Sequence, residues 1–356
     1  MHTLHLLATA DRRGAEVFGF ELAGGLTELG HDSDVVALAP STSTGASLDV
    51  EVLEAVRRPQ VLAQLRRRAR QADAVVGHGS RGLVGGTLAT VSTSTPLLYR
   101  SIGDPAFWGA SRLRRTRVGL QLRRAAAVTA LWPGAARTIA SQYGVPSERV
   151  HVVPNAVDAT RFRPADEHER TAARTELGLD PQRSVVLSLG ALSPEKRVPL
   201  AIAAVAGLDD ATLVIAGDGP DRAAVEREAT RLLPGRHLLL GSVDDVRPLY
   251  AAADVLVLPS TTEGQPAVVI EAGLCGVPAV ATDVGGVSTV VRHGQTGTLV
   301  PVDVTGDALW DALTSTLAQA RSLGHRAHEL CLEQFSQQAV ASQWDALLES
   351  VQGVGR

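Results

Sequence analysis

Residues 254–301 read DVLVLPSTTEGQPAVVIEAGLCGVPAVATDVGGVSTVVRHGQTGTLVP, and this stretch decides the fold. Its composition predicts a short apolar strand at residues 255–259, a polar turn ending in Glu263 and Gly264, and a helix opened by Pro266. Proline suits the first helical turn because the N–H that it lacks would have no partner there. The free amides at a helix start carry partial positive charge. The stretch therefore predicts a site for an anionic ligand such as a phosphate.

Two carboxylates bracket the start of this predicted helix. Glu263 lies in the turn, and Glu271 follows eight positions later on the helix. At ~1.5 Å per helical residue the two groups are separated by up to roughly 12 Å. That is too far for an acid and a base that flank one bond. The spacing suits two hydroxyl-rich ends of one long ligand whose anionic middle lies at the helix start.

The stretch resembles the E-x7-E signature of retaining glycosyltransferases of family 4, and the flanking PS, EG, EA, GVP and GG segments strengthen the resemblance. The resemblance implies the GT-B fold, in which two Rossmann-like α/β domains face a central cleft and the last helix crosses back to the first domain. It also implies that Glu271 holds the ribose of a nucleotide sugar and that Glu263 lies beside the transferred sugar.

The length and pattern of the chain predict two domains. A chain of 356 residues exceeds one typical core. Its first third alternates strands and helices, as parallel sheets covered on both faces do. We expect an acceptor-side domain at residues 1–165, a nucleotide-sugar-binding domain at 166–335 and a returning helix at 336–356. Residues 164–174 are expected to be the linker, and STSTGAS at residues 41–47 a surface loop.

Composition predicts a soluble globular protein, with 45% hydrophobic and 20% charged residues. Cys275 and Cys331 lie in apolar helical contexts without metal-ligand spacing, which indicates reduced core residues and a cytoplasmic protein. The first 13 residues have no basic leader, and no apolar run approaches the ~18 residues of a membrane span. We therefore expect no metal site, and any membrane contact would be peripheral, at the inner face. High Arg and Ala usage suggests a bacterial coding background.

Lys196 is the only lysine, against 33 arginines, which indicates that a compact point charge is needed there. Lysine is a common phosphate binder. The segment resembles the family's G-R-x4-K pattern, in which both cations bind the donor diphosphate, but Ala191 replaces the arginine. Compensation by Arg197 is left open. The resemblance implies these donor-binding residues: Gly14, Gly190, Lys196, Arg197, Gly217, Val243, Glu263, Gly264, Gln265, Pro266 and Glu271.

In the first domain, Gly14 and His78 each follow a predicted strand. Gly14 resembles the family's glycine loop, with a plain helix-start role as the alternative. His78 is a candidate catalytic residue together with Glu263 and Lys196, because carboxyl ends of strands bind ligands in doubly wound sheets. The alternative is a histidine bonded to loop backbone. The acceptor side is predicted to include Arg100, Asp104, Trp108 and Asn155.

Charge is divided unevenly along the chain. Residues 1–163 hold 20 arginines and 13 acidic residues, and the remainder holds 14 basic and 25 acidic residues. An arginine run at residues 112–124 is either a solvated helix face or a contact for anionic lipid or a phosphorylated acceptor. Few aromatic residues are interleaved with it, which argues against nucleic acid.

The resemblance implies transfer of a sugar from a nucleoside diphosphate-sugar, with UDP or GDP as the nucleotide and UDP favoured, to a hydroxyl acceptor without a required cofactor. The acceptor is a small molecule, a lipid or a glycan. Ser288 and Thr289 replace the proline and glutamate of the family's GG-x-P-E pattern. Three alternatives remain: a sugar-nucleotide epimerase of related fold, a non-catalytic nucleotide-sugar-binding subunit, and a dehydrogenase, which the glycine pattern fits poorly.

Overall fold

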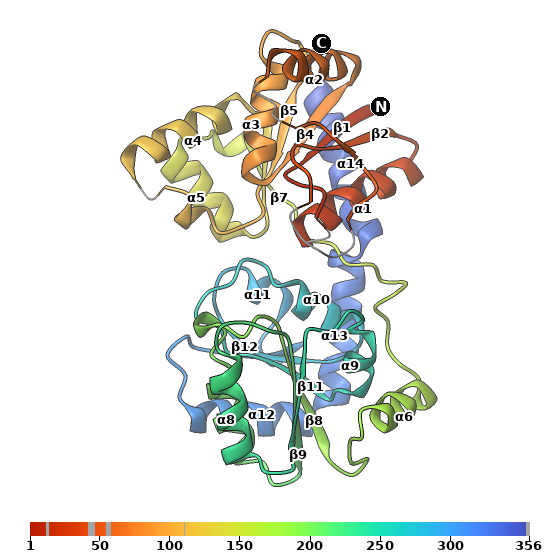
Figure 1. Cartoon of the computed structure of the whole chain (residues 1–356), viewed down its shortest axis with the longest axis vertical. Helices are drawn as coiled ribbons and strands as arrows, with labels where there is room; N and C mark the ends of the chain where they lie inside the picture. Colours follow the sequence, from red (N-terminus) through yellow and green to blue (C-terminus); the bar gives the residue numbers. More distant parts are fainter. Residues whose placement is uncertain (12–13, 42–46, 55–57, 110, 354–356) are drawn as a thin grey trace. The chain divides into compact units, whose positions relative to one another are not determined.

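The computed structural model describes residues 1–11, 14–41, 47–54, 58–109 and 111–353, and the chain forms two compact units (Figure 1). The first unit comprises Met1–Ala156 and Gln337–Arg356, and the second comprises Val157–Ser336. The expected boundary after residue 165 thus lies inside the second unit. Most of the loop expected at residues 41–47 lies outside the described residues. Where the chain enters and leaves the second unit, the Val157 N–H donates to the Phe335 carbonyl over 2.9 Å.

The first unit contains a seven-stranded parallel sheet with the order β3-β2-β1-β4-β5-β6-β7. Its strands are β1 His2–Leu7, β2 Asp32–Ala37, β3 Glu51–Val52, β4 Ala74–His78, β5 Leu97–Arg100, β6 Ala127–Ala130 and β7 Val150–Val152. The helices are α1 Gly14–Glu28, α2 Pro59–Gln71, α3 Gly79–Thr90, α4 Arg112–Arg124, α5 Pro133–Tyr143 and α14 Gln337–Gly353, with short 3-10 turns η1 Pro105–Phe107 and η2 Ser147–Arg149.

The C-terminal helix α14 is part of the first unit. Its fully buried Trp344 and Leu348 pack with Phe18 and Leu22 of α1 in one apolar cluster. His31 Nε2 and Asp345 Oδ1, 2.7 Å apart, tie the turn after α1 to α14. The helix therefore covers apolar side chains of α1 that water would otherwise reach.

The second unit contains a six-stranded parallel sheet with the order β10-β9-β8-β11-β12-β13. Its strands are β8 Ser184–Leu189, β9 Ala211–Ala216, β10 His237–Gly241, β11 Val255–Leu258, β12 Ala279–Thr282 and β13 Gly297–Val300. The helices are α6 Glu167–Glu176, α7 Val198–Ala206, α8 Arg222–Leu232, α9 Arg247–Ala252, α10 Ala267–Leu274, α11 Val287–Val290, α12 Gly306–Ala318 and α13 Ala320–Phe335, with the 3-10 turn η3 Pro194–Lys196.

The linker predicted at residues 164–174 is wrong, because most of it is helix α6. Asp166 accepts a hydrogen bond from the Glu169 N–H, and the Glu169 side chain accepts one from the Asp166 N–H. This capping box satisfies two amides that the helix leaves free. Arg170 and Arg174 then bind Asp254 at 2.6 and 2.7 Å, which fixes α6 to the second unit. The charged residues that suggested a linker are thus the ones that dock the helix.

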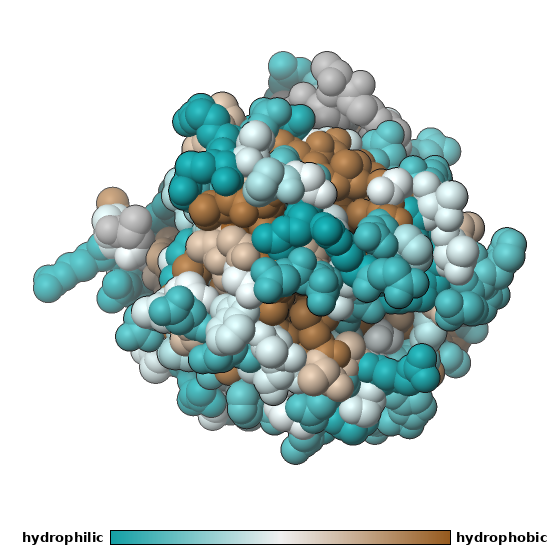
Figure 2. Space-filling view, turned by 90° about the horizontal axis from the view of Figure 1, so that it is seen from below, coloured by the Kyte–Doolittle hydropathy of each residue, from teal (hydrophilic) through white to brown (hydrophobic). Residues whose placement is uncertain are grey.

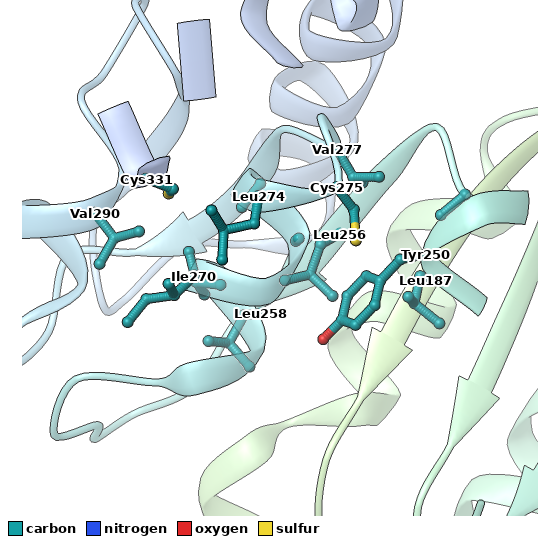
Figure 3. Packing of buried hydrophobic residues seen from close by; sticks show 14 of the residues in the cluster. Leu187, Tyr250, Leu256, Leu258, Ile270, Leu274, Cys275, Val277, Val290 and Cys331 are labelled. Atoms are coloured by element: carbon teal, nitrogen blue, oxygen red, sulfur yellow. The ribbon is translucent and has the colours of Figure 1, made fainter. Parts of the chain in front are cut away.

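Apolar side chains fill the space between the second sheet and its helices, and Figure 3 shows Leu187, Leu256 and Ile270 in one of these clusters. The surface in Figure 2 mixes hydrophilic and hydrophobic residues, as folded proteins do. In the part of the chain that the structure describes, no helix is both long and apolar enough to cross a bilayer.

Candidate functional site

The carboxyl ends of β8 and β9 are brought together by two glycines. Gly190 and Gly217 have φ values of 146° and 134°, a region that side chains rarely adopt. A Cβ placed on Gly217 would collide with the carbonyl oxygen of Gly190. Both predicted donor-site glycines therefore serve a close backbone approach at the sheet edge where doubly wound folds bind ligands.

Lys196 and Glu263 meet at this edge. The Lys196 Nζ donates to Glu263 Oε1 over 2.6 Å, and the Ser260 hydroxyl donates to the same oxygen over 2.6 Å. The side chains are 22% and 9% exposed, so the pair is largely shielded from water. Glu263 Oε2 makes no hydrogen bond to any described residue. One carboxylate oxygen is thus committed to the protein, and the other is available to a ligand hydroxyl.

Arg197 has the unusual backbone of this region. Its φ of 47° lies in the left-handed region that favours glycine, and its Nε donates to the Pro259 carbonyl over 2.6 Å. Its Nη2 is buried without a hydrogen-bond partner among the described residues. Burial lowers the pKa of the guanidinium. A buried donor without a partner is costly, so this group suits an anionic ligand beside Lys196.

A glycine pair holds the turn that carries Glu263. Gly285 has a φ of 59°, and a Cβ there would collide with the Glu263 carbonyl. The Gly286 N–H donates to the Gly264 carbonyl over 2.6 Å. The Gln265 amide donates to Thr289 Oγ1 over 3.0 Å, and that hydroxyl donates to the Gly286 carbonyl over 2.6 Å. Thr289, the departure from the family pattern, therefore fixes the predicted donor-site turn.

Glu271 lies on α10, which Pro266 precedes as its N-cap. The Tyr250 hydroxyl donates to Glu271 Oε2 over 2.7 Å. Figure 3 shows Tyr250 beside the apolar side chains of Leu187 and Leu256. Burial raises the pKa of the Glu271 carboxyl, and the bond from Tyr250 opposes this shift. Tyr250 thus fixes the carboxylate for which the resemblance implies a ribose contact.

The remaining predicted residue of the second unit is Val243, which follows β10. Its side chain is partly buried against the same apolar cluster as Tyr250. Apart from Glu271, which lies in the body of α10, the structure places the predicted donor-binding residues of this unit in the loops and helix starts at the carboxyl ends of β8, β9, β10 and β11. Gly14 alone among the donor-binding residues belongs to the first unit.

His78, at the end of β4, is 2% exposed and belongs to a buried pair. His78 Nε2 and His5 Nδ1 are 3.1 Å apart, and His5 Nε2 lies 3.1 Å from Thr3 Oγ1. His78 Nδ1 is buried without a partner among the described residues, and its ring lies close to Gly19 of α1. Burial lowers the pKa of His5 to about 3 and the pKa of His78 well below 6.5. Both rings are therefore neutral at physiological pH and are packed inside the first unit.

The predicted acceptor-side residues also belong to the first unit and divide into two sites. Arg100 is 2% exposed, stacks on Phe18 at 3.5 Å and donates to Asn155 Oδ1 over 2.7 Å. Burial lowers the pKa of Arg100 to about 9, and its Nη1 is buried without a partner in the described ranges. Asp104 and Trp108 instead shape the η1 turn.

In that turn, Asp104 accepts from the Ala106 N–H over 2.9 Å, and Trp108 contacts the rings of Tyr99 and Tyr143. Gly14 begins α1, and no other described residue lies within 4 Å of a Cβ placed there. Among the described residues there is no cluster of three His, Cys, Asp or Glu side chains able to hold a metal ion.

Sequence reasoning missed three residues that position others: Tyr250, Ser260 and His5. Tyr250 is one of only three tyrosines, and this rarity was an available signal. Ser260 was noted only as part of a flanking dipeptide. His5 lies within an ordinary buried strand, so nothing in its neighbourhood indicates the contact with His78.

Two family models match the chain. The model described as "Glycosyl transferases group 1" matches residues 169–329, and the model described as "Glycosyltransferase Family 4" matches residues 12–161. Relatives include D-inositol 3-phosphate glycosyltransferase of Nocardia farcinica, 36% identical over 54% of this chain and 46% of that protein. N-acetyl-alpha-D-glucosaminyl L-malate synthase of Bacillus anthracis is 32% identical over 58% of this chain and 55% of that protein. The matches thus span about half the length of these relatives.

Among solved structures, Anabaena Alr3699/HepE in complex with UDP has a TM-score of 0.86 over 98% of this chain and 100% of that chain, at 22% identity. The same protein in complex with UDP-glucose has a TM-score of 0.82 at 22% identity and the same coverage of both chains. The likeness supports the predicted GT-B fold class, which the two parallel sheets confirm. Since the two family models together cover most of its length, the chain belongs to the family 4 glycosyltransferases.

Proposed function

We propose that this protein transfers a sugar from a UDP-sugar to a hydroxyl group of an acceptor, with retention of anomeric configuration and without a metal ion. The observation that carries the proposal is the shielded Lys196–Glu263 pair at the carboxyl ends of β8 and β11. It supplies a cation and a carboxylate beside backbone that glycines bring close together. The solved UDP and UDP-glucose complexes of Alr3699/HepE support the choice of uridine.

In this proposal the donor diphosphate binds Lys196 Nζ and the unpaired Nη2 of Arg197, near the first-turn amides of α10. Arg197 then supplies the second cation that Ala191 lacks. Glu271, held by Tyr250, binds the ribose hydroxyls. Glu263 uses its free Oε2 to bind the transferred sugar.

The chemistry follows from where charge develops. The bond between the anomeric carbon and the leaving phosphate oxygen breaks, and the acceptor oxygen bonds to the same carbon from the same face. The acceptor proton passes to the leaving phosphate oxygen, so that UDP departs and no protein nucleophile is required. The two cations stabilise the negative charge that grows on the diphosphate, which is where preorganised charge lowers a barrier.

The acceptor class stays open in this proposal among a small molecule, a lipid and a glycan. The two relatives differ in the acceptor that their names indicate. All three acceptor classes offer a hydroxyl group.

The test begins with thermal unfolding in the presence of UDP, GDP, ADP, TDP or NAD, with EDTA and then with magnesium. A ligand at ~100 times its Kd adds about 2.7 kcal/mol to the stability of the folded state. We expect a shift with UDP that EDTA does not remove. A shift with NAD alone would favour a dehydrogenase.

Product analysis with UDP-glucose and a panel of alcohols then separates the remaining alternatives. Glycoside formation that requires the alcohol supports the transferase. Conversion of the donor without any acceptor would indicate an epimerase, and UDP binding without any turnover would indicate a binding subunit.

A further inference from the structure

Helix α4 of the first unit presents large apolar side chains to solvent. Leu113 is 82% exposed and Leu120 is 56% exposed, and Phe107 in the preceding η1 turn is 69% exposed. Leu113 and Leu120 are seven positions apart, so they lie on the same face of the helix two turns apart. Exposed leucines with this spacing form a surface that gains free energy when it leaves water.

Arginines are numerous in this segment, and the first acidic residues before and after it in the chain are Asp104 and Glu148. Seven arginines lie between these two residues. Arg112, Arg114, Arg115, Arg117 and Arg124 are exposed, and none has an ion pair with any residue in the described ranges. A solvated helix face ordinarily carries both signs of charge, and i,i+4 pairs stabilise it. All the charged residues of α4 are arginines.

The opposite side of α4 fixes the helix to the unit. Gly119 and Leu122 are buried, and a Cβ on Gly119 would approach the Tyr143 carbonyl to 2.9 Å. Arg123 Nη1 donates to that carbonyl over 2.8 Å, and Figure 1 shows α4 lying along α5. The exposed leucines therefore belong to a docked helix and not to a frayed end.

The η1 turn is anchored in the same way. The Tyr143 hydroxyl donates to the Pro105 carbonyl over 2.7 Å, and Trp108 packs between Tyr99 and Tyr143. Asp104 caps the turn. Because the neighbours of Phe107 are held in place, its outward position is built into the fold, and little conformational entropy is lost when it meets a partner.

We propose that the α4 surface, defined as Phe107, Leu113 and Leu120 with Arg112, Arg114, Arg117 and Arg124, docks on anionic lipid bilayers. The leucines enter the interface between headgroups and acyl chains, and the arginines bind the phosphates above them. Aliphatic anchors flanked by unpaired cations match the chemistry of an anionic membrane surface. Single-stranded nucleic acid instead calls for stacked aromatic side chains, and only Phe107 is an exposed ring in this set. The proposal does not depend on sugar transfer.

The experiment is co-sedimentation of the whole protein with two kinds of vesicle, phosphatidylcholine alone and phosphatidylcholine mixed with phosphatidylglycerol. Two double variants test the two components: Leu113→Ser with Leu120→Ser, and Arg114→Glu with Arg117→Glu. The matched control is Arg67→Glu with Arg70→Glu on α2. This change alters net charge equally on another basic helix of the same unit, one without large exposed apolar residues. Circular dichroism and the unfolding temperature verify that each variant is folded.

We expect binding to the mixed vesicles, weak binding to the neutral ones, and a loss of at least ~10-fold for both α4 variants. The α2 control should bind within about twofold of the unmodified protein, because its charges do not adjoin an apolar surface. Equal loss in the control would overturn the proposal in favour of a nonspecific charge effect. Unchanged binding of the leucine variant would also overturn it, as would absence of vesicle binding together with tight, salt-sensitive binding of single-stranded RNA.

Discussion

The two units place polar side chains at the carboxyl ends of their parallel strands in opposite ways. In the second unit Lys196 and Glu263 form an ion pair whose side chains are 22% and 9% exposed, and Glu263 Oε2 makes no hydrogen bond to any described residue. In the first unit His78 and Arg100 are 2% exposed and packed against α1, and each leaves one nitrogen without a partner among the described residues. The same topological position thus carries a partly exposed ion pair in one sheet and closely packed, buried side chains in the other. A fold directs attention to the strand ends, whereas burial and pairing decide what each residue does there.

The largest effect on stability is expected from the buried residues of the first unit. Arg100→Ala leaves a cavity beside Phe18 and removes the donor to Asn155, so we expect a loss of about 3 kcal/mol of unfolding free energy. UDP binding should persist at temperatures where the variant is folded. Chemical denaturation and calorimetric titration with UDP measure the two quantities. A variant of full stability with lost UDP affinity would reverse our assignment of this residue to internal order.

In the second unit the main change should be in UDP affinity. Lys196→Ala removes a charge-assisted contact to the diphosphate, and we expect UDP affinity to fall by ~10- to 100-fold, or about 2 kcal/mol. The free energy of unfolding should also fall, by about 1 to 3 kcal/mol, because Glu263 is 9% exposed and loses the cation with which it pairs. UDP affinity is therefore measured at temperatures where the variant is folded. The matched control is Arg227→Ala, an exposed cation of α8 with no partner in the described part of the unit. Unaltered UDP affinity in the Lys196 variant would remove the central support for the donor site.

Lowering the pH should destabilise the first unit through its buried His5. The pKa of His5 is about 3 in the folded protein and 6.5 in the unfolded chain, so the unfolded state binds the proton first. The stability that neutral His5 contributes is therefore complete above pH 6.5 and is lost as pH falls towards 3, by up to about 1.4 kcal/mol per pH unit. His5→Gln should lessen the fall in unfolding temperature between pH 7 and pH 5. His325→Gln, at an exposed position, should leave the fall as it is.

The smallest expected effect concerns Tyr250, which lies in the core yet reaches the site. Tyr250→Phe keeps the ring and removes the hydrogen bond to Glu271, so we expect UDP to bind about fivefold more weakly, near 1 kcal/mol. Pyrophosphate, which has neither ribose nor uracil, should bind as before, because the hydrogen bond from Tyr250 acts only on the ribose contact of Glu271. If UDP and pyrophosphate were weakened alike, Tyr250 would be acting on the fold of α10 and not on Glu271.

Sequence patterns predict the features of this structure that depend on residues close together in the chain. They miss the contacts between residues that are far apart in the chain. The alternation of strands and helices in the first third of the chain, the strand at residues 255–259 and the helix that follows Pro266 are local patterns, and the structure bears them out. The contacts of Tyr250 with Glu271 and of His5 with His78 join residues 21 and 73 positions apart. No local period encodes such pairs. The linker prediction failed for a different reason, because charge was interpreted as solvation when it supplied a cap and two ion pairs.

Among the residues of the sequence pattern, the glycines are the most informative about the structure. Gly217 and Gly285 each leave room for a carbonyl of a separate loop, and the motif spacing records this requirement. These parts of the pattern are requirements for backbone clearance, and they are met although Ala191 and Thr289 depart from the pattern in their side chains.

The pairing of Val157 with Phe335 has a consequence for the engineering of such chains. Because the backbone enters and leaves the second unit at hydrogen-bonded neighbours, the two ends of that unit meet. A segment with adjacent ends can be exchanged as a cassette while the chain on either side needs little adjustment. Chimeras joined at residues 156–157 and 336–337 would then exchange the whole second unit between related enzymes and test which unit determines the donor and which the acceptor.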